Sequence, residues 1–170
     1  MKIKILFFTS ILFFVHTRSF AQLMTFGFVK NCMSYKRKTV TDELTKKHFF
    51  IVDKKVEDSD EDILEGCTYY SNEKEPANPG EIRVRSLIEP KKKITEISFI
   101  KGLKNDYTNN YIDVYKQMVS FFNNGNTFKS NKFKTDVNVF VKNGIYYYAY
   151  TKYESAYILI SDRDLEKIYF

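Results

Sequence analysis

Apolar residues recur along this chain with two different periods, and each change of period separates a helix from a strand. The clearest helical stretch has four apolar residues at steps of three and four: Tyr111, Tyr115, Met118 and Phe122. This spacing covers one face of a helix, and Gly125 follows just beyond the stripe, where helices commonly end. We expect a helix over residues 109–123, capped near Thr108 or Asn109.

Two shorter helices are predicted near the start of the chain, over residues 23–33 and 40–47. Both have apolar residues at helical spacing, and the second ends in a lysine-rich turn. We expect the second to be capped near Thr39 or Thr41. His48 follows its last turn, so we expect His48 to occupy a C-terminal cap position in place of Gly or Asn.

Short runs of β-branched and aromatic residues, separated by turn residues, predict strands elsewhere in the chain. The predicted strands cover residues 49–55, 67–71, 81–88, 94–100, 128–133, 137–142, 145–151 and 156–160. Asn143-Gly144 lies between two of these runs, and both residues tolerate the positive φ that a type I′ turn requires. The sequence therefore predicts a hairpin with a two-residue turn.

The register of this hairpin assigns its side chains to two faces. One face holds three valines opposite three tyrosines: Val137 with Tyr150, Val139 with Tyr148, and Val141 with Tyr146. We predict that this apolar face is the core side and that these tyrosines are structural. The other face holds Phe140 opposite Tyr147, with Ile145 and Ile158 near them. If helices cover only one side of the sheet, these four residues lie near solvent and form a contact surface.

The first 21 residues have the order of a signal peptide. Lys2 and Lys4 precede an apolar run over residues 5–15, and Ser19 and Ala21 stand at the −3 and −1 positions of a cleavage site. The run has 11 residues, whereas a membrane-spanning helix needs about 20. We therefore predict cleavage after Ala21 and a periplasmic or secreted protein of residues 22–170 with no integral membrane segment.

The mature chain has the size of one domain and shows a repeated order of elements. Residues 40–100 run from helix to strand to meander, and residues 109–160 repeat that order. We expect an α+β fold, an antiparallel β-meander sheet packed on helices. A single domain of residues 22–170 would then contain two pseudo-repeat halves, 22–104 and 105–170.

This helix-plus-meander layout resembles the β-lactamase-inhibitor-protein-like architecture. Together with a signal peptide ending in Ser19-Phe20-Ala21-Gln22, the layout is also similar to small secreted proteins of the Bacteroidota without an assigned function. The resemblance covers most of the chain and implies the fold. It rests on the pattern of elements and transfers no functional residues.

Removal of the signal peptide lowers the net positive charge of the protein. The whole chain has 27 basic and 21 acidic residues, a net charge of +6. Cleavage removes three basic residues and no acidic one, so the net charge falls to +3. A nucleic-acid-binding domain would show a stronger basic bias, so we expect no nucleic-acid partner.

Two cysteines, Cys32 and Cys67, remain after cleavage. Export would allow a disulfide between them, closing a loop that the chain-entropy model associates with about 3 to 4 kcal/mol. Cysteine is also among the most buried residue types, so both could instead be buried apolar residues. The sequence leaves the two alternatives open.

Catalytic and metal motifs are scarce in this sequence. The mature chain has one histidine, His48, too few for a zinc site and for most triads. Asp58, Asp60 and Asp62 imitate the start of a calcium loop, but Ile63 and Tyr69 replace its Gly and Glu, so we expect a solvated acidic loop. There is no phosphate loop, nucleophile elbow or dinucleotide fingerprint. We therefore expect no enzyme, metal or cofactor.

Three functions remain, in order of preference. The first is a non-enzymatic exported protein that contacts an unknown protein partner in the envelope or medium through Phe140, Tyr147, Ile145 and Ile158. The second is a periplasmic protein that binds a small ligand or glycan, and a cavity lined by tyrosines would favour it. The third is a cryptic hydrolase, which would need His48 paired with an acid inside a cleft.

Overall fold

The computed structural model describes residues 23–52, 63–73, 80–102, 107–123 and 125–170. The strands among these residues form one eight-stranded antiparallel sheet in the order β1-β2-β3-β4-β8-β7-β6-β5. They are β1 (Phe50–Ile51), β2 (Thr68–Ser71), β3 (Glu81–Glu89), β4 (Lys92–Ile100), β5 (Asn126–Lys129), β6 (Asp136–Lys142), β7 (Ile145–Lys152) and β8 (Ser155–Ser161).

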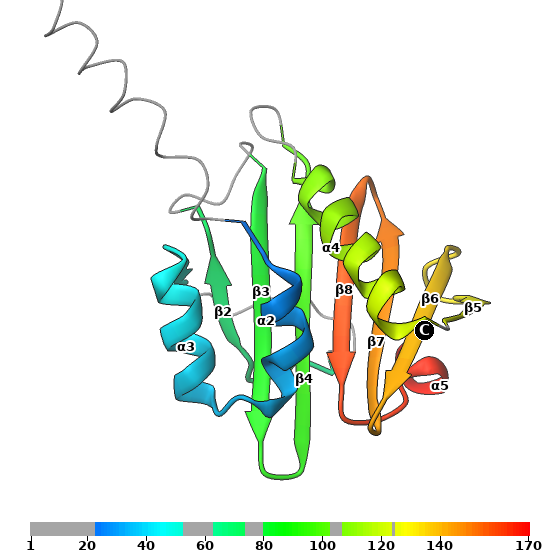
Figure 1. The fold of residues 1–170 in the computed structure, drawn as a ribbon, viewed down its shortest axis with the longest axis horizontal. Coiled ribbons are helices and arrows are strands. Elements are labelled where there is room, and N and C mark those ends of the chain that lie inside the picture. Colours follow the sequence, from blue (N-terminus) through cyan, green and yellow to red (C-terminus); the bar gives the residue numbers. More distant parts are fainter. Residues whose placement is uncertain (1–22, 53–62, 74–79, 103–106, 124) are drawn as a thin grey trace, which may run out of the picture.

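Helices lie mainly on one face of this sheet. They are α2 (Phe26–Asn31), which continues into a 3-10 turn (Cys32–Ser34), α3 (Arg37–Lys46), α4 (Thr108–Phe122) and the short α5 (Glu166–Tyr169). Figure 1 shows α2, α3 and α4 in front of the sheet, with α3 near β2 and α4 running obliquely across β8 and β7. The predicted α+β class, an antiparallel meander packed on helices, is therefore confirmed.

The sheet consists of two four-stranded meanders that meet in its middle. Helix α3 precedes β1–β4, and α4 precedes β5–β8, so the order of elements is the same in both halves. The halves join where β4 pairs with β8, with Ile97 opposite Ile158. Both of these side chains are fully buried. A duplication of one half stays a prediction.

The main hydrophobic core lies between the helices and the sheet. Val114 and Met118 of α4 and Leu44 of α3 are buried there against Ile82 and Phe99 of the sheet. Because side chains alternate along a strand, this core takes alternate residues of the central strands β3, β4 and β8. The remaining residues of the same strands point to the opposite face.

A second, smaller core covers part of that opposite face and is closed by the C-terminus. The Phe170 ring lies 5.0 Å from that of Tyr148 and 5.2 Å from that of Tyr150. The Tyr148 hydroxyl donates to Asp164 Oδ1 at 2.9 Å and accepts from Leu165 N–H at 2.7 Å. The C-terminal segment thus packs on the β7 part of the sheet. It leaves the region over β3 and β4 without a helix.

The Asn143-Gly144 hairpin has the predicted register. Phe140 lies opposite Tyr147, and Val139 lies opposite Tyr148. Asn143 and Gly144 have φ values of 55° and 74°, as the type I′ turn requires. Of the three tyrosines predicted to be structural, Tyr148 and Tyr150 are buried and Tyr146 is half-buried. Val141, opposite Tyr146, is exposed, so the predicted core face is only partly buried.

Helix α4 covers Thr108–Phe122, within one residue of the predicted range 109–123, and Asn123 with a φ of 60° caps its C-terminal end. Its N-cap position is Tyr107, so the predicted cap at Thr108 or Asn109 is wrong. Gly125 is required for another reason, because a Cβ there would lie 2.6 Å from the Phe140 ring. Helix α3 begins at Arg37 after Lys36, which makes no side-chain cap, so the predicted cap at Thr39 or Thr41 is wrong. The helix therefore begins about one turn earlier than the threonines suggest, with the polar residues Arg37 and Lys38 in its first turn.

His48 occupies the predicted cap position. Its φ is 62°, it is exposed, and its N–H donates to Thr45 O at 2.9 Å. Two other predictions lie outside the described residues. One is the signal peptide of residues 1–21, and the other is the run of acidic residues containing Asp58, Asp60 and Asp62.

Cys32 and Cys67 are not joined by a disulfide, so the disulfide alternative is wrong for this structure. Cys32 is buried in the core beneath the helices, and its thiol donates to Val29 O at 3.4 Å. Cys67 packs against the smaller core on the other face of the sheet. The sheet therefore lies between the two thiols, and burial raises the pKa of the Cys32 thiol to about 12.

Candidate functional site

The surface predicted around Phe140 and Tyr147 is part of the hydrophobic core, which is a correction to the sequence analysis. Phe140 and Tyr147 are each 3% exposed, and Ile158 is fully buried. The Phe122 ring of α4 lies 5.6 Å from that of Phe140 and 4.7 Å from that of Tyr147. Ile145 is half-buried against the same core. These residues cannot form a contact surface, because α2 and α4 cover this face.

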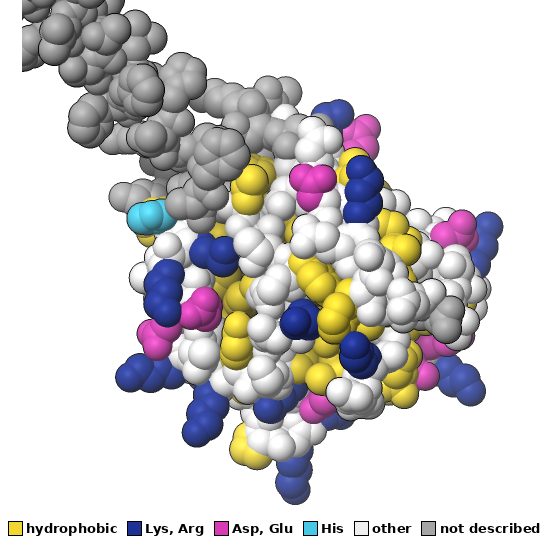
Figure 2. Space-filling view, viewed as in Figure 1, with side chains coloured by type: hydrophobic (Ala, Val, Ile, Leu, Met, Phe, Trp, Pro, Cys, Tyr) yellow, Lys and Arg dark blue, Asp and Glu magenta, His cyan; other side chains and the backbone are white. Residues whose placement is uncertain are grey.

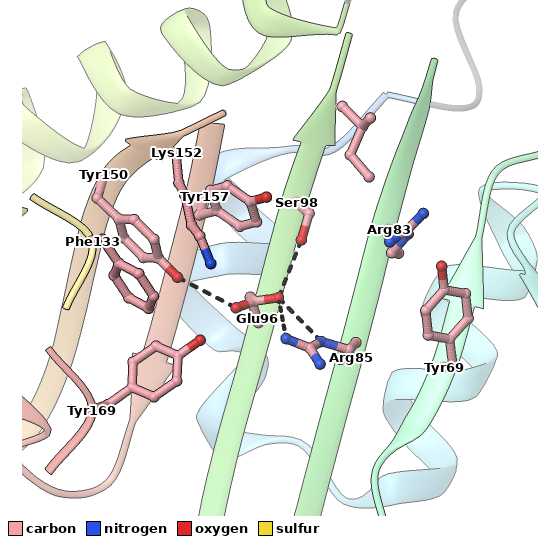
Figure 3. A pocket seen from close by; sticks show the side chains of 11 residues that line it. Tyr69, Arg83, Arg85, Glu96, Ser98, Phe133, Tyr150, Lys152, Tyr157 and Tyr169 are labelled. Carbon is pink, nitrogen blue, oxygen red and sulfur yellow. Dashed lines mark hydrogen bonds and ion pairs between the residues drawn. The ribbon is translucent and has the colours of Figure 1, made fainter. Parts of the chain in front are cut away.

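The opposite face contains a cavity of about 180 Å³ over β3 and β4, where none of the described helices covers these strands. We call it the Tyr–Arg cavity. Figure 3 shows most of its polar and aromatic side chains on the strands, with Phe133 and Tyr169 reaching in from neighbouring segments. Its lining residues are Tyr69, Arg83, Arg85, Glu96, Ser98, Ile100, Phe133, Tyr150, Lys152, Tyr157 and Tyr169.

Strand alternation explains why charged residues gather in this cavity. Arg83 and Arg85 are two residues apart in β3, so both point away from the helices. Glu96 and Ser98 of the adjacent β4 lie opposite Arg85 and Arg83. Residues between them, such as Val84, point into the main core. The meander therefore has an apolar face under the helices and a charged face on the other side.

Glu96 is held by hydrogen bonds on both of its oxygens. Arg85 Nε and Nη2 donate to Glu96 Oε1 at 3.1 and 2.9 Å, and Ser98 Oγ donates to the same atom at 3.2 Å. The Tyr150 hydroxyl donates to Glu96 Oε2 at 3.4 Å. Glu96 is only 2% exposed. These donors compensate for the desolvation of its charge.

A second ion pair extends the charged face toward β2. Arg83 Nε donates to Glu81 Oε1 at 3.0 Å, and Arg83 Nη2 also contacts that oxygen. Ser71 Oγ donates to Glu81 Oε2 at 2.7 Å. Each arginine is thus matched by one carboxylate, and both guanidinium groups have a fixed position.

Stacked aromatic rings form the opposite wall of the cavity. The Phe133 and Tyr150 rings are parallel at 5.6 Å, and Tyr150 stacks on Tyr157 at 5.1 Å. The Tyr169 ring lies edge-on to Phe133 at 5.4 Å. Lys152 Nζ stands 4.5 Å from the centre of the Phe133 ring. This wall combines flat apolar surfaces with hydroxyl groups and one cation.

Tyr69 has the most unusual environment of the lining residues. Its side chain is buried, yet among the described residues its hydroxyl has no hydrogen-bond partner. Burial raises the pKa of this hydroxyl far above its ordinary value, so the group remains a donor at neutral pH. A buried hydroxyl without a partner costs about 1–3 kcal/mol. A polar atom of a ligand in the cavity would remove that cost.

The cavity has a small excess of positive charge. Arg83, Arg85 and Lys152 face the carboxylates of Glu81 and Glu96, which leaves one positive charge among these five groups. Within the described residues, no carboxylate forms an ion pair with Lys152. The site is therefore suited to a polar ligand that is neutral or anionic.

Other chemistry is absent from the described part of the chain. His48 is exposed at the end of α3, and the cavity lining contains no histidine or cysteine. No group of three potential metal ligands occurs among the described residues. None of the described helices is long and apolar enough to cross a membrane.

The sequence analysis did not identify the Tyr–Arg cavity, although a signal for it was present. In β3, Glu81, Arg83 and Arg85 alternate with apolar residues, and in β4, Glu96 and Ser98 do the same. Charged residues at the same parity in two paired strands indicate a shared polar face. The sequence does not indicate that Phe133, Tyr157 and the C-terminal segment partly enclose this face and turn it into a cavity.

Comparisons with known proteins do not assign the chain to a family or a function. No family model matches the chain, and no match was found among the curated proteins or the solved structures. The function is therefore argued from the cavity itself.

Proposed function

We propose that this chain is a non-enzymatic, exported binding protein that holds a saccharide in the Tyr–Arg cavity. The observation that supports the proposal most strongly is the buried Tyr69 hydroxyl, which has no partner among the described residues. The signal-peptide pattern of residues 1–21 supports export to the periplasm or the medium. The alternative function, contact with a protein partner, loses the surface on which it was based, because Phe140 and Tyr147 are buried.

A saccharide fits both the size and the chemistry of the cavity. A cavity of about 150 Å³ holds one benzene molecule, so 180 Å³ accommodates a ring of similar size. The flat faces of Tyr157 and Phe133 carry negative charge at their centres and attract the C–H groups of a sugar ring. Arg83 and Tyr69 offer hydrogen-bond donors for hydroxyl groups.

The same groups favour binding over catalysis. Glu81 and Glu96 are each engaged by an arginine, and neither has a histidine near it in the lining. A general acid or base must be within hydrogen-bond reach of a substrate proton, whereas both carboxylates here are already bound by protein donors. The groups are positioned for recognition.

Some exposed apolar side chains do remain on the helix-covered face. Ile112, Val119 and Phe121 of α4 are each more than a third exposed, and Figure 2 shows hydrophobic atoms gathered on that face between basic side chains. Nothing in the structure identifies what would cover them. They therefore support no second function.

The decisive experiment is calorimetric titration of residues 22–170 with neutral and acidic mono- and oligosaccharides. We expect the Tyr69→Phe variant to bind about tenfold more weakly, because the ligand loses one buried hydrogen bond. The variant should be at least as stable as the wild type, since it loses a hydroxyl that has no partner. Tyr115→Phe makes the same chemical change on the other face and should leave affinity unchanged.

Two outcomes would contradict the proposal. One is a wild-type protein that binds no saccharide in the set. The other is a Tyr69→Phe variant with wild-type affinity, which would mean that this hydroxyl does not contact the ligand.

A further inference from the structure

A second pocket adjoins the Tyr–Arg cavity at the ends of strands β7 and β8. It has a volume of about 460 Å³ and lies between the β7–β8 turn, the first turns of α4 and the segment that precedes β6. We call it the hairpin groove. In Figure 1 the β7–β8 turn and the start of α4 lie next to each other at the top of the sheet. Phe133 and Lys152 line both hollows, so the two meet at these side chains.

The turn beside the groove has an unfavourable backbone. Tyr153 and Glu154 are the two residues of the β7–β8 turn, and their φ values are 50° and 60°. Positive φ at both positions is characteristic of a type I′ turn, which favours Asn and Gly. The β6–β7 turn of this same chain uses Asn143-Gly144 at the equivalent positions. A bulky residue with positive φ is rare and costs stability.

The side chain of Tyr153 gains no compensation by packing. It is 86% exposed, the most exposed of the large hydrophobic side chains in the described residues, and it lines the hairpin groove. Backbone strain of this kind occurs preferentially where a side chain serves a ligand. An exposed ring at a strained turn beside a groove is therefore a candidate for contact with a ligand.

Lys152 connects the two hollows. Its ammonium group lies 4.5 Å from the centre of the Phe133 ring, in the Tyr–Arg cavity, and 4.9 Å from that of Tyr153, in the hairpin groove. Among the described residues no carboxylate pairs with it. A cation held at the junction without a counter-ion attracts an anionic group of a ligand that crosses it.

We propose that the ligand is an acidic oligosaccharide that spans both hollows. One sugar occupies the Tyr–Arg cavity, the next packs on the ring of Tyr153, and a carboxylate or sulfate lies near Lys152. This inference rests on the proposed saccharide-binding function and extends it by giving the ligand a minimum of two sugars and a negative charge.

The test compares ligands of different length and charge by calorimetric titration of residues 22–170. The ligands are a hexuronic acid, its linear oligomers, and neutral oligomers of equal length, with an acidic peptide and a nucleoside monophosphate for comparison. We expect the acidic oligomers to bind at least about tenfold more tightly than the monomer or the neutral oligomers. Their affinity should fall as salt concentration rises.

Two variants locate the contacts. Tyr153→Asn gives the turn a residue that tolerates positive φ and keeps the Glu154 carboxylate in the groove, so this variant should fold well and unfold at a higher temperature. We expect it to lose about tenfold in affinity for acidic oligomers and to bind the monomer as the wild type does. Lys152→Gln should remove the preference for acidic over neutral oligomers, whereas Lys38→Gln on the distant α3 should not.

The outcomes separate this inference from the proposed function. If monomers bind and depend on Tyr69, but oligomers bind no better or the turn variant keeps full affinity for them, the second subsite is wrong and the saccharide site stands. Equal affinity for neutral and acidic oligomers contradicts the acidic ligand. Tighter binding of the peptide or the nucleotide overturns the ligand class, and no saccharide binding at all overturns both proposals.

Discussion

Glu96 illustrates how a single buried charge can be tolerated in this sheet. Its carboxylate is nearly inaccessible to solvent, and it accepts hydrogen bonds from Arg85, Ser98 and Tyr150. Removing one partner of a buried ion pair leaves the other charge uncompensated. A surface ion pair behaves differently, because water replaces the lost partner.

This difference leads to a prediction at the residue scale. We expect Glu96→Ala to lower the free energy of unfolding by about 3 kcal/mol, because Arg85 would lose its buried partner. The matched control is Glu43→Ala, which breaks an exposed pair with Lys46 on α3 and should cost less than about 1 kcal/mol. Urea unfolding followed by circular dichroism measures both values. Equal losses in the two variants would show that Glu96 is not held as the structure describes.

Tyr69 and Tyr147 show that burial alone does not define the role of a tyrosine. Both are nearly inaccessible, but the Tyr147 hydroxyl donates to Lys30 O at 3.2 Å, whereas that of Tyr69 has no partner in the described part of the chain. Tyr147 is therefore structural. Tyr69 is the residue whose hydrogen-bonding capacity remains for a ligand.

At the scale of elements, the two type I′ turns of the second meander differ in sequence but not in backbone. Asn143-Gly144 and Tyr153-Glu154 each connect two strands through two residues with positive φ. Asn and Gly adopt this region readily, while other residues pay about 1–2 kcal/mol each. The residues of the β7–β8 turn therefore lower the stability of the folded protein relative to Asn and Gly at the same positions.

The comparison predicts a gain in stability on exchanging the turn residues. We expect Tyr153→Asn with Glu154→Gly to raise the free energy of unfolding by about 1–2 kcal/mol. The reverse exchange, Asn143→Tyr with Gly144→Glu, should lower it by a similar amount. Thermal and urea unfolding of both variants provide the test, and a destabilised Tyr153→Asn, Glu154→Gly protein would show that Tyr153 contributes packing that outweighs its strain.

At the scale of the whole molecule, burial of tyrosines on both faces of the sheet makes stability sensitive to alkaline pH. Burial raises the pKa of Tyr147 to about 12 and that of Tyr150 well above its ordinary value, and it raises the pKa of Cys32 to about 12. In the unfolded chain these groups ionise near pH 9 to 10. The folded state therefore holds protons that the unfolded state releases.

The sign of the pH effect follows from that difference. Stability from these groups is fully present below about pH 9 and is lost as pH rises toward 12, by up to about 1.4 kcal/mol per pH unit for each group. Urea unfolding at a series of pH values, with tyrosinate absorbance recorded in parallel, measures the slope. In Tyr147→Phe the slope above about pH 10 should decrease by one group's contribution, and an unchanged slope would contradict the burial of this hydroxyl.

Much of the architecture could be predicted from local patterns. The stripe through Tyr111 and Met118 specified α4, and Asn143-Gly144 specified a hairpin and its register. His48 was placed correctly because a helix end has few alternatives for its last carbonyl groups. These predictions depend on residues that are close in the sequence, where periodicity and turn geometry are informative.

The candidate site could not be predicted in the same way. Alternation showed that Phe140 and Tyr147 share a face, but both faces of β6 and β7 carry apolar residues, so the sequence did not decide which face the helices would cover. The Tyr–Arg cavity could not be predicted for the same reason. Its walls come from β2, β3, β4, β8, β7 and the C-terminus, which are far apart in the sequence.

The sequence by itself determined the α+β class, the main helix, the hairpin and the pairing of its residues, because these follow from spacing along the chain. Only the tertiary structure decided that α2 and α4 pack on the Phe140 face, that Cys32 and Cys67 lie on opposite sides of the sheet, and that Tyr69, Glu96 and Lys152 line one cavity. The physical reason is that a strand's alternation defines two faces but does not say what packs on either. That choice depends on the total apolar area buried when distant segments come together.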